Sequence, residues 1–136
     1  MQCAETSIRV RYAETDQMGV VYYANYLVWM EVARVEYCRQ AGFEYRDMEA
    51  HGAVLAVTEA KCQYRASARF DDEVRILTRV TESRSRSIRF AYEMRRASDE
   101  KLLAVGETLH AVCDRQGKMI RMPEKFRAFF SASGVE

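Results

Sequence analysis

One long apolar helix, followed almost entirely by strands, constrains the fold of this chain more than any other feature. From about Tyr22 to Ala41 apolar residues recur at steps of three and four, the spacing of one helix face. Further apolar residues fill most of the remaining circumference, and Gly42 is placed to end the helix. Because a helix that is apolar nearly all round is buried, other elements must wrap it.

The rest of the chain is strand-like. Apolar and polar residues alternate at 6–13, before the helix, and at 52–65, 73–83, 87–96 and 102–114, after it. Such alternation predicts half-buried strands. Short turns between consecutive strands imply antiparallel pairing, because parallel pairing needs long crossovers. The sequence therefore predicts an α+β fold in which an antiparallel sheet curls around one long central helix.

The alternation also predicts which side chains share one face of each strand. In the segment before the helix they are Ile8, Val10 and Tyr12. In the next strand they are Val54, Ala56, Thr58, Ala60, Cys62 and Tyr64. In the two after it they are Val74, Ile76, Thr78, Val80, Ile88, Phe90, Tyr92 and Met94. Gly106, inside the last long strand, indicates a bulge or a close backbone approach. A short strand is expected at 119–121, and Pro123 suits the first turn of a helix ending near Phe130.

Size and charge exclude several classes of protein. A chain of 136 residues predicts one domain, 1–136, since domains typically have about 100–200 residues. With 21 Lys+Arg against 20 Asp+Glu, the net charge of +1 gives no electrostatic case for binding nucleic acid. No apolar run approaches the roughly 18 residues of a membrane span, and residues 1–11 hold no signal-peptide core. We expect a cytoplasmic protein.

The metal-binding residue types are scattered. Four cysteines (Cys3, Cys38, Cys62, Cys113) include no Cys-x-x-Cys pair, and the two histidines lie far apart. Zinc sites usually show close paired spacing, so we expect no metal and no other cofactor. Unpaired cysteines, one in the expected helix and two in expected strands, suit a reducing compartment.

A carboxylate stands just ahead of the helix. Asp16 lies in a polar turn closed by Gly19. A helix N-terminus offers unpaired N–H groups and partial positive charge, which could polarise a carbonyl while the carboxylate acts as base or nucleophile. Asp is also a favoured turn and cap residue, and on the residues alone that plainer interpretation is preferred.

The motif around Asp16 resembles a known family. The stretch Tyr12–Tyr26, YAETDQMGVVYYANY, is similar to the signature of the 4-hydroxybenzoyl-CoA thioesterase family, acyl-CoA thioesterases with the hotdog fold. The resemblance continues through Tyr64–Glu73 and ends at Gly117–Pro123, covering about 7–130. It implies a hydrolase of acyl-CoA, a sheet wrapped around one helix, and homodimers that often pair into homotetramers, with sites between two protomers.

Residue roles follow from this resemblance. It makes Asp16 the catalytic carboxylate, attacking the thioester carbonyl or activating a water, and the Tyr23 backbone N–H the group that polarises the carbonyl oxygen. It places Gly19, Val20 and Tyr22 in the substrate-binding segment. Many related short-chain enzymes carry His where this chain has Tyr23, whereas the aromatic branch has an aromatic residue there. The acyl group, aromatic or short aliphatic, is therefore left open.

Basic residues gather in the middle of the chain. Between Lys61 and Lys101 there are 11 positive residues against 7 acidic ones. The turn at 83–87 is expected to bind the phosphates of coenzyme A through Arg84, Arg86 and Ser87, joined by Lys118 or Arg121. The alternative is that these side chains form the solvated face of an amphipathic sheet.

Other functions stay open at this point. A non-catalytic module that binds acyl-CoA or an acyl carrier would not need Asp16. A hydratase of the same fold would need a histidine near the helix start, and neither His51 nor His110 stands there in the sequence. Glu31, on the helix, is the reserve carboxylate, although an ion pair with Arg34 is the preferred role for it. Tyr22, Tyr26 and Trp29 are expected in the core or in dimer contacts.

Overall fold

The computed structural model describes residues 3–131, which form a five-stranded sheet and three helices. In chain order the elements are β1 (Ala4–Arg9), α1 (Asn25–Ala41), α2 (Tyr45–Ala50), β2 (Val54–Tyr64), β3 (Glu73–Ser83), β4 (Ser87–Arg96), β5 (Leu102–Cys113) and α3 (Glu124–Arg127). Single 3₁₀ turns lie at Tyr12–Glu14 and Ala128–Phe130. No helix in the described part of the chain is long and apolar enough to span a membrane.

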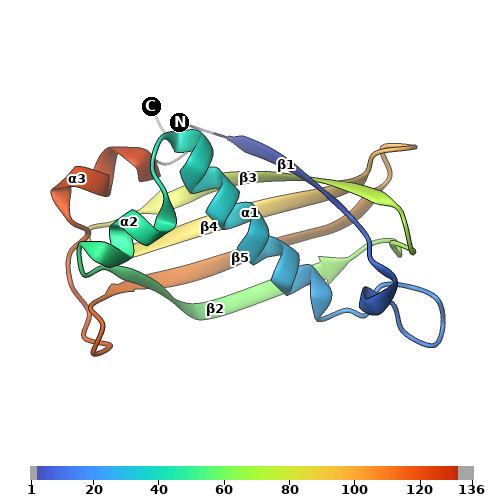
Figure 1. The fold of residues 1–136 in the computed structure, drawn as a ribbon, viewed down its shortest axis with the longest axis horizontal. Coiled ribbons are helices and arrows are strands. Elements are labelled where there is room, and N and C mark those ends of the chain that lie inside the picture. The colour runs from blue at the N-terminus through green and yellow to red at the C-terminus, as the bar shows by residue number, and fades with distance from the viewer. Residues whose placement is uncertain (1–2, 132–136) are drawn as a thin grey trace.

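The strands pair in the order β1-β3-β4-β5-β2, and every pairing is antiparallel. α1 crosses one face of this sheet, while α2 and α3 cover one end of it (Figure 1). The predicted α+β architecture, an antiparallel sheet around one long helix, is confirmed. Gly42 ends α1 with a left-handed φ of 116°, a conformation that glycine adopts without a Cβ penalty.

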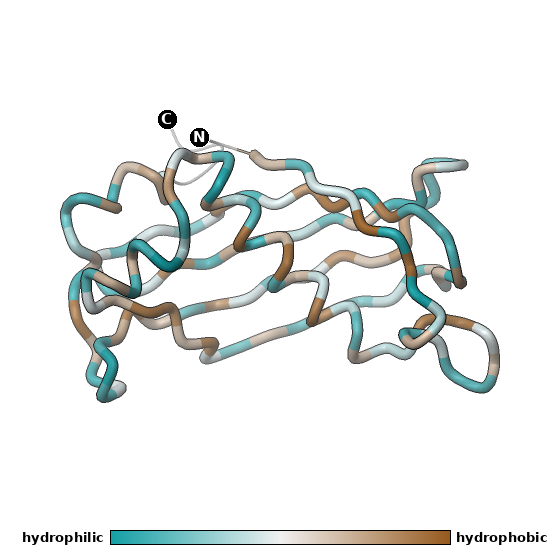
Figure 2. The backbone as a smooth tube through the Cα atoms, in the orientation of Figure 1, coloured by the Kyte–Doolittle hydropathy of each residue, from teal (hydrophilic) through white to brown (hydrophobic). Residues whose placement is uncertain are grey.

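The core lies between α1 and the sheet. All eight residues assigned to the inner face of β3 and β4 are buried, as the alternation predicts. Hydropathy alternates along these strands in Figure 2. From α1, Tyr26, Trp29 and Met30 pack onto this face. A Cβ at Gly106 would collide with Met30 Cε and with the carbonyl oxygen of Lys61, so the expected close approach is confirmed.

The helix differs from the prediction in two ways. It begins at Asn25 rather than near Tyr22. Only one side of it is buried, because the sheet covers one face: Leu27, Val28 and Val32 are 40%, 51% and 43% exposed. Burial all round is therefore wrong for the single chain, and an apolar flank of α1 faces outward.

The face assigned to β2 is also wrong in its first half. Val57 pairs with His110 and Glu59 with Leu109, so Thr58 is an extra residue in a bulge. A bulge shifts the two-residue alternation by one, which puts Leu55 and Val57 on the helix side. Past the bulge the assignment of Ala60, Cys62 and Tyr64 to that side agrees with the register.

Three smaller differences lie near the ends. β1 stops at Arg9, and Tyr12 is exposed in a 3₁₀ turn rather than sharing a face with Ile8. The expected strand at 119–121 is reduced to an isolated bridge between Cys113 and Met119. α2 was not predicted. The last helix follows Pro123 and its 3₁₀ continuation ends at Phe130, close to the expected bounds.

Candidate active site

Asp16 lies in a tight turn between β1 and α1. Its Oδ1 accepts the N–H of Met18 at 2.9 Å and that of Val20 at 3.4 Å. Its own N–H donates to the Val20 carbonyl at 2.8 Å, and its carbonyl accepts from Gly19 at 3.0 Å. The turn-cap interpretation of Asp16 is thus correct for Oδ1. Its Oδ2 accepts no hydrogen bond from residues 3–131 and is available for chemistry.

The start of α1 supplies unused donors beside this turn. The N–H groups of Asn25 and Tyr26 donate to the carbonyls of Tyr22 and Tyr23. Those of Tyr23 and Ala24 donate to no acceptor within the described chain, and no side chain caps the helix. A 17-residue helix also adds partial positive charge at this end. Two backbone donors at the helix start therefore have no acceptor within the described residues.

A pocket of about 330 Å³ brings Asp16 and Tyr23 together. Asp16, Val20 and Tyr23 line it from the turn and helix start, and the segment after β2 lines it from the other side. Of the other predicted residues, Gly19 lies in the same turn with a φ of 81°, and the Tyr22 ring lies tilted against that of Tyr23 with ring centroids 4.6 Å apart. The residues of this motif are thus neighbours in space, whereas Gly19 and Tyr22 do not line the pocket.

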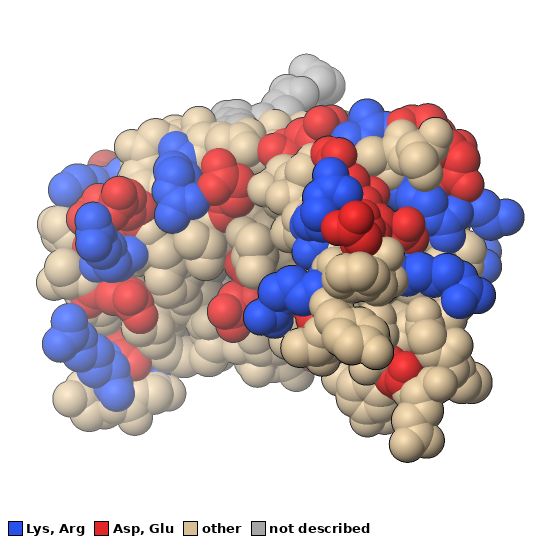
Figure 3. Space-filling model, turned by 45° about the vertical axis from the view of Figure 1, so that its right-hand side comes forward, with Lys and Arg blue, Asp and Glu red and all other residues tan. Residues whose placement is uncertain are grey.

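One wall of the pocket is aromatic. The Tyr64 hydroxyl donates to the carbonyl oxygen of Tyr23 at 3.1 Å, and its ring lies 5.1 Å from that of Tyr26. Partial burial raises the pKa of Tyr64 to about 12, so its phenol stays protonated at neutral pH. Figure 3 brings this end of the molecule forward and shows charged side chains of both signs above a lobe dominated by uncharged ones.

The residues expected to bind phosphate lie at the opposite end of the sheet. Arg84 and Arg86 are in the β3–β4 turn, Ser87 begins β4, and Lys118 is in the turn after β5 (Figure 1). Arg84 lines a hollow of about 280 Å³ with Arg121. The other three do not line it. Within one protomer the structure does not bring these side chains to Asp16, and their role stays a prediction.

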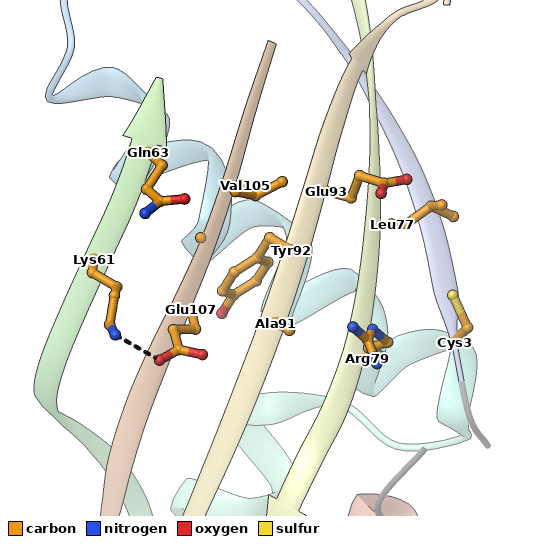
Figure 4. Close-up of a pocket in the computed structure, with 11 residues that line it drawn as sticks. Cys3, Lys61, Gln63, Leu77, Arg79, Ala91, Tyr92, Glu93, Val105 and Glu107 are labelled. Atoms are coloured by element: carbon orange, nitrogen blue, oxygen red, sulfur yellow. Dashed lines mark ion pairs between the residues drawn. The ribbon is translucent and has the colours of Figure 1, made fainter. Parts of the chain in front are cut away.

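A larger hollow, of about 390 Å³, lies on the face of the sheet turned away from α1 (Figure 4). Its side chains include Leu77, Ala91 and Val105 among charged groups, and Lys61 pairs with Glu107 at 3.3 Å. None of the residues singled out in the sequence as catalytic or substrate-binding lines it. We therefore place the candidate active site at the Asp16 pocket, although it is the smaller of the two.

The remaining candidate residues lie elsewhere. His110 is buried under α1 with Nε2 2.8 Å from the Thr108 hydroxyl, and His51 ends α2; neither lines the Asp16 pocket. Glu31 is exposed, and the expected pair with Arg34 is wrong, because the Arg34 guanidinium donates to the Tyr92 hydroxyl at 3.2 Å.

The cysteines and acidic residues show no metal centre in the part of the chain that is described. Its residues contain no group of three or more His, Cys, Asp or Glu that could hold an ion. The four thiols are free, with Cys38 in α1 and with Cys62 and Cys113 in strands, as expected. Burial raises the pKa of Cys38 to about 12, which keeps that thiol unreactive.

Two contributors to the site escaped the sequence reasoning. The sequence places Tyr64 only on one face of its strand. Tyr64 is also the first residue of the family motif Tyr64–Glu73, which was a signal for a role in the site. Glu14 belongs to the signature, which predicts no role for it, yet it is a buried carboxylate two residues before Asp16. The signal for Glu14 was its charge, because a charged residue close to a helix that is expected to be buried needs hydrogen-bond partners.

Comparison with known proteins agrees with this site. A family model described as "Thioesterase-like superfamily" matches residues 10–130. The acyl-CoA thioester hydrolase YbgC of Escherichia coli O6:H1 is 36% identical over 106 residues, which cover 78% of each protein. A DHNA-CoA thioesterase structure from Staphylococcus aureus has a TM-score of 0.88 and 34% identity, covering 95% of this chain and 87% of that one.

A 4-hydroxybenzoyl-CoA thioesterase, solved with 4-hydroxybenzoyl-CoA, has a TM-score of 0.85 and covers 96% of this chain and 100% of that one. At 19% identity this likeness shows the shared hotdog fold alone. The family resemblance carried by the Asp16 motif is confirmed by the model match, which includes that motif and the whole pocket. This chain belongs to the thioesterase-like superfamily.

Proposed function

We propose that this protein is an acyl-CoA thioesterase, which hydrolyses an acyl-CoA thioester to a free acid and CoA at the Asp16 pocket. One observation carries the proposal: a carboxylate with a free oxygen shares a pocket with Tyr23, whose N–H at the helix start has no acceptor in the described chain. The names of the relatives YbgC and DHNA-CoA thioesterase support the same reaction class.

The helix start supplies the electrophilic half of the mechanism. The thioester carbonyl oxygen accepts a hydrogen bond from the Tyr23 N–H, beside the N–H of Ala24. Negative charge develops on this oxygen as the carbonyl carbon becomes tetrahedral, and fixed donors at a helix N-terminus stabilise that charge. A backbone donor does this whatever side chain stands at position 23.

Asp16 supplies the other half, by one of two routes. As a base, its Oδ2 takes a proton from a water whose oxygen attacks the carbonyl carbon. The C–S bond then breaks, CoA leaves as its thiolate, and the proton on Asp16 passes to that thiolate or to solvent. As a nucleophile, Oδ2 attacks the carbon itself, CoA leaves, and water hydrolyses the resulting acyl-aspartyl anhydride. Both routes end in the acid, CoA and an ionised Asp16.

We also propose that the working form is a homodimer, or a dimer of dimers. β2 is an edge strand with Val57 half exposed, and the apolar flank of α1 is uncovered. A second copy that pairs its β2 antiparallel to the first covers both surfaces. Such pairing sets the Arg84 end of one protomer beside the Asp16 end of the other, where phosphate groups of CoA would lie.

The test is a panel of aliphatic and aromatic acyl-CoAs, with release of the CoA thiol followed by a thiol reagent. Turnover of at least one member supports the proposal, and the preferred member identifies the acyl group. CoA binding in a calorimeter without turnover of any member would instead favour a non-catalytic binding module. A hydratase is disfavoured because no histidine lines the Asp16 pocket, whose lining residues are all described.

A further inference from the structure

Glu14 stands out among the groups that the proposed mechanism does not use. It is 6% exposed, and among residues 3–131 it is the one acidic side chain in the buried class. Burying a carboxylate is costly unless hydrogen bonds replace its water. Its burial therefore implies contacts that a neutral side chain at position 14 could not make.

The hydrogen bonds of Glu14 account for its burial. Its Oε2 accepts the indole N–H of Trp29 at 2.9 Å, and its Oε1 accepts the Arg11 N–H at 2.8 Å. Its carbonyl oxygen accepts the Tyr22 N–H at 2.8 Å and the Asn25 side-chain amide at 2.9 Å. The Arg11 guanidinium lies 3.6 Å from Oε2 at the solvent side.

These contacts join the two halves of the proposed catalytic device. Arg11 belongs to the segment that leads into the Asp16 turn, and Trp29 lies in the second turn of α1. Tyr22 and Asn25 flank Tyr23 and Ala24, the residues whose N–H groups are unused. The Glu14 backbone carbonyl therefore holds both neighbours of the unused donors, and its carboxylate fixes the peptide that carries this carbonyl by bonding Trp29 and Arg11. Asp16 follows Glu14 by two residues.

We infer that Glu14 is a positioning residue, which fixes the Asp16 carboxylate relative to the Tyr23 and Ala24 N–H groups; this rests on the proposed function. Both side-chain oxygens of Glu14 receive N–H donors, so the site calls for a carboxylate. A glutamine would turn its NH₂ group toward one of the two donors and lose that bond. Small displacements of this kind cost reaction rate, about 100-fold for 1 Å.

The test compares Glu14→Gln with Glu36→Gln, which removes a carboxylate that pairs with Arg39 in the C-terminal half of α1. We expect Glu14→Gln to lower kcat at least about tenfold with KM changed less than about threefold. Glu36→Gln is expected to keep both. The melting temperature of each variant separates loss of positioning from loss of fold.

The single tryptophan gives a spectroscopic readout that does not depend on activity. In ¹H–¹⁵N spectra, Glu14→Gln must shift the Trp29 indole signal together with the amide signals of Tyr23 and Ala24. Trp29→Phe removes the same bond from its other end, so Glu14→Gln must cost less in that background.

The outcomes separate the two proposals. A parent protein that hydrolyses no acyl-CoA refutes the proposed function, whatever Glu14 does. An active parent whose Glu14→Gln variant keeps kcat within about twofold refutes the role of Glu14. Tyr23 and Ala24 amide signals that stay in place in Glu14→Gln refute the positioning itself, with or without activity.

Discussion

The hydroxyl of Tyr64, at the end of β2, donates to the carbonyl oxygen of Tyr23, at the start of α1, across 3.1 Å. This bond links the edge strand of the sheet to the backbone segment that carries the open N–H donors. It lies on the wall of the Asp16 pocket. The geometry of the donors therefore depends on a side chain from β2 as well as on α1.

We expect Tyr64→Phe to lower kcat about fivefold, since one neutral hydrogen bond contributes about 1 kcal/mol. Tyr45→Phe is the matched control, because the Tyr45 hydroxyl also bonds backbone, accepting the Leu55 N–H at 2.9 Å, far from the pocket. Steady-state kinetics of both variants check this. Equal losses of kcat in the two would show that the Tyr64 bond matters only for folding.

His110 predicts a dependence of stability on pH. Burial and the charge of Arg34 lower its pKa from 6.5 to about 4, so the folded protein binds this proton less tightly than the unfolded chain does. The contribution to stability is complete above pH 6.5 and is lost as pH falls toward 4. The loss is on the order of 3 kcal/mol in the free energy of unfolding.

Urea denaturation at several pH values between 7 and 4 measures this loss. His110→Asn should flatten the curve in that range. An unchanged slope in His110→Asn would assign the pH dependence to other groups.

Gly106→Ala should destabilise the fold by about 1–3 kcal/mol, because its Cβ would meet the Met30 side chain and the Lys61 backbone where little room for movement exists. Thermal melting checks this against Ala104→Gly, in the same strand, which removes a methyl group instead. Gly106→Ala melting at the temperature of the parent would mean that α1 lies farther from β5 than described.

Val28→Asp and Val57→Asp should each prevent the proposed dimer, by placing a charge on the apolar flank of α1 or on β2. Met119→Asp, at an exposed apolar residue in the turn after β5, is the control. Light scattering gives the mass of each. A parent that is monomeric at the concentrations used for catalysis would contradict the dimer itself.

The sequence predicted the fold well where periodicity alone decides it. The inner faces of β3 and β4 follow a strict alternation, and all eight of their residues are buried. The face of β2 could not be read in this way, because the bulge at Thr58 leaves the composition of the strand unchanged while it shifts the alternation. The exposed flank of α1 could not be predicted, because the apolar residues Leu27, Val28 and Val32 have the same composition as residues of a buried face.

The candidate site was predictable only in its contiguous part. Asp16, Val20 and Tyr23 lie within one motif, so a short turn brings them together. Tyr64 lies 41 residues after Tyr23 and reaches the pocket from the end of β2. The pairing of β2 in the sheet brings it there, and residue spacing within one motif does not predict that pairing. The Arg84 turn is separated from Asp16 by the length of the sheet (Figure 1), so its role in binding phosphate stays a prediction.

The Asp114 turn offers a control for Asp16 within the same chain. There Oδ1 accepts the N–H groups of Gln116 and Lys118, both at 2.9 Å, and the Asp114 carbonyl accepts from Gly117 at 3.0 Å. This repeats the turn of Asp16, without a pocket that brings it to a helix start. Asparagine can cap both turns, so it removes the charge and keeps the backbone.

The most direct measurement is therefore kcat/KM of Asp16→Asn and Asp114→Asn on the best acyl-CoA of the panel. Loss of the catalytic carboxylate predicts a fall of about 100- to 10,000-fold for Asp16→Asn, with parent activity for Asp114→Asn. Activity of Asp16→Asn equal to that of the parent would show that Asp16 only caps its turn and would contradict the mechanism.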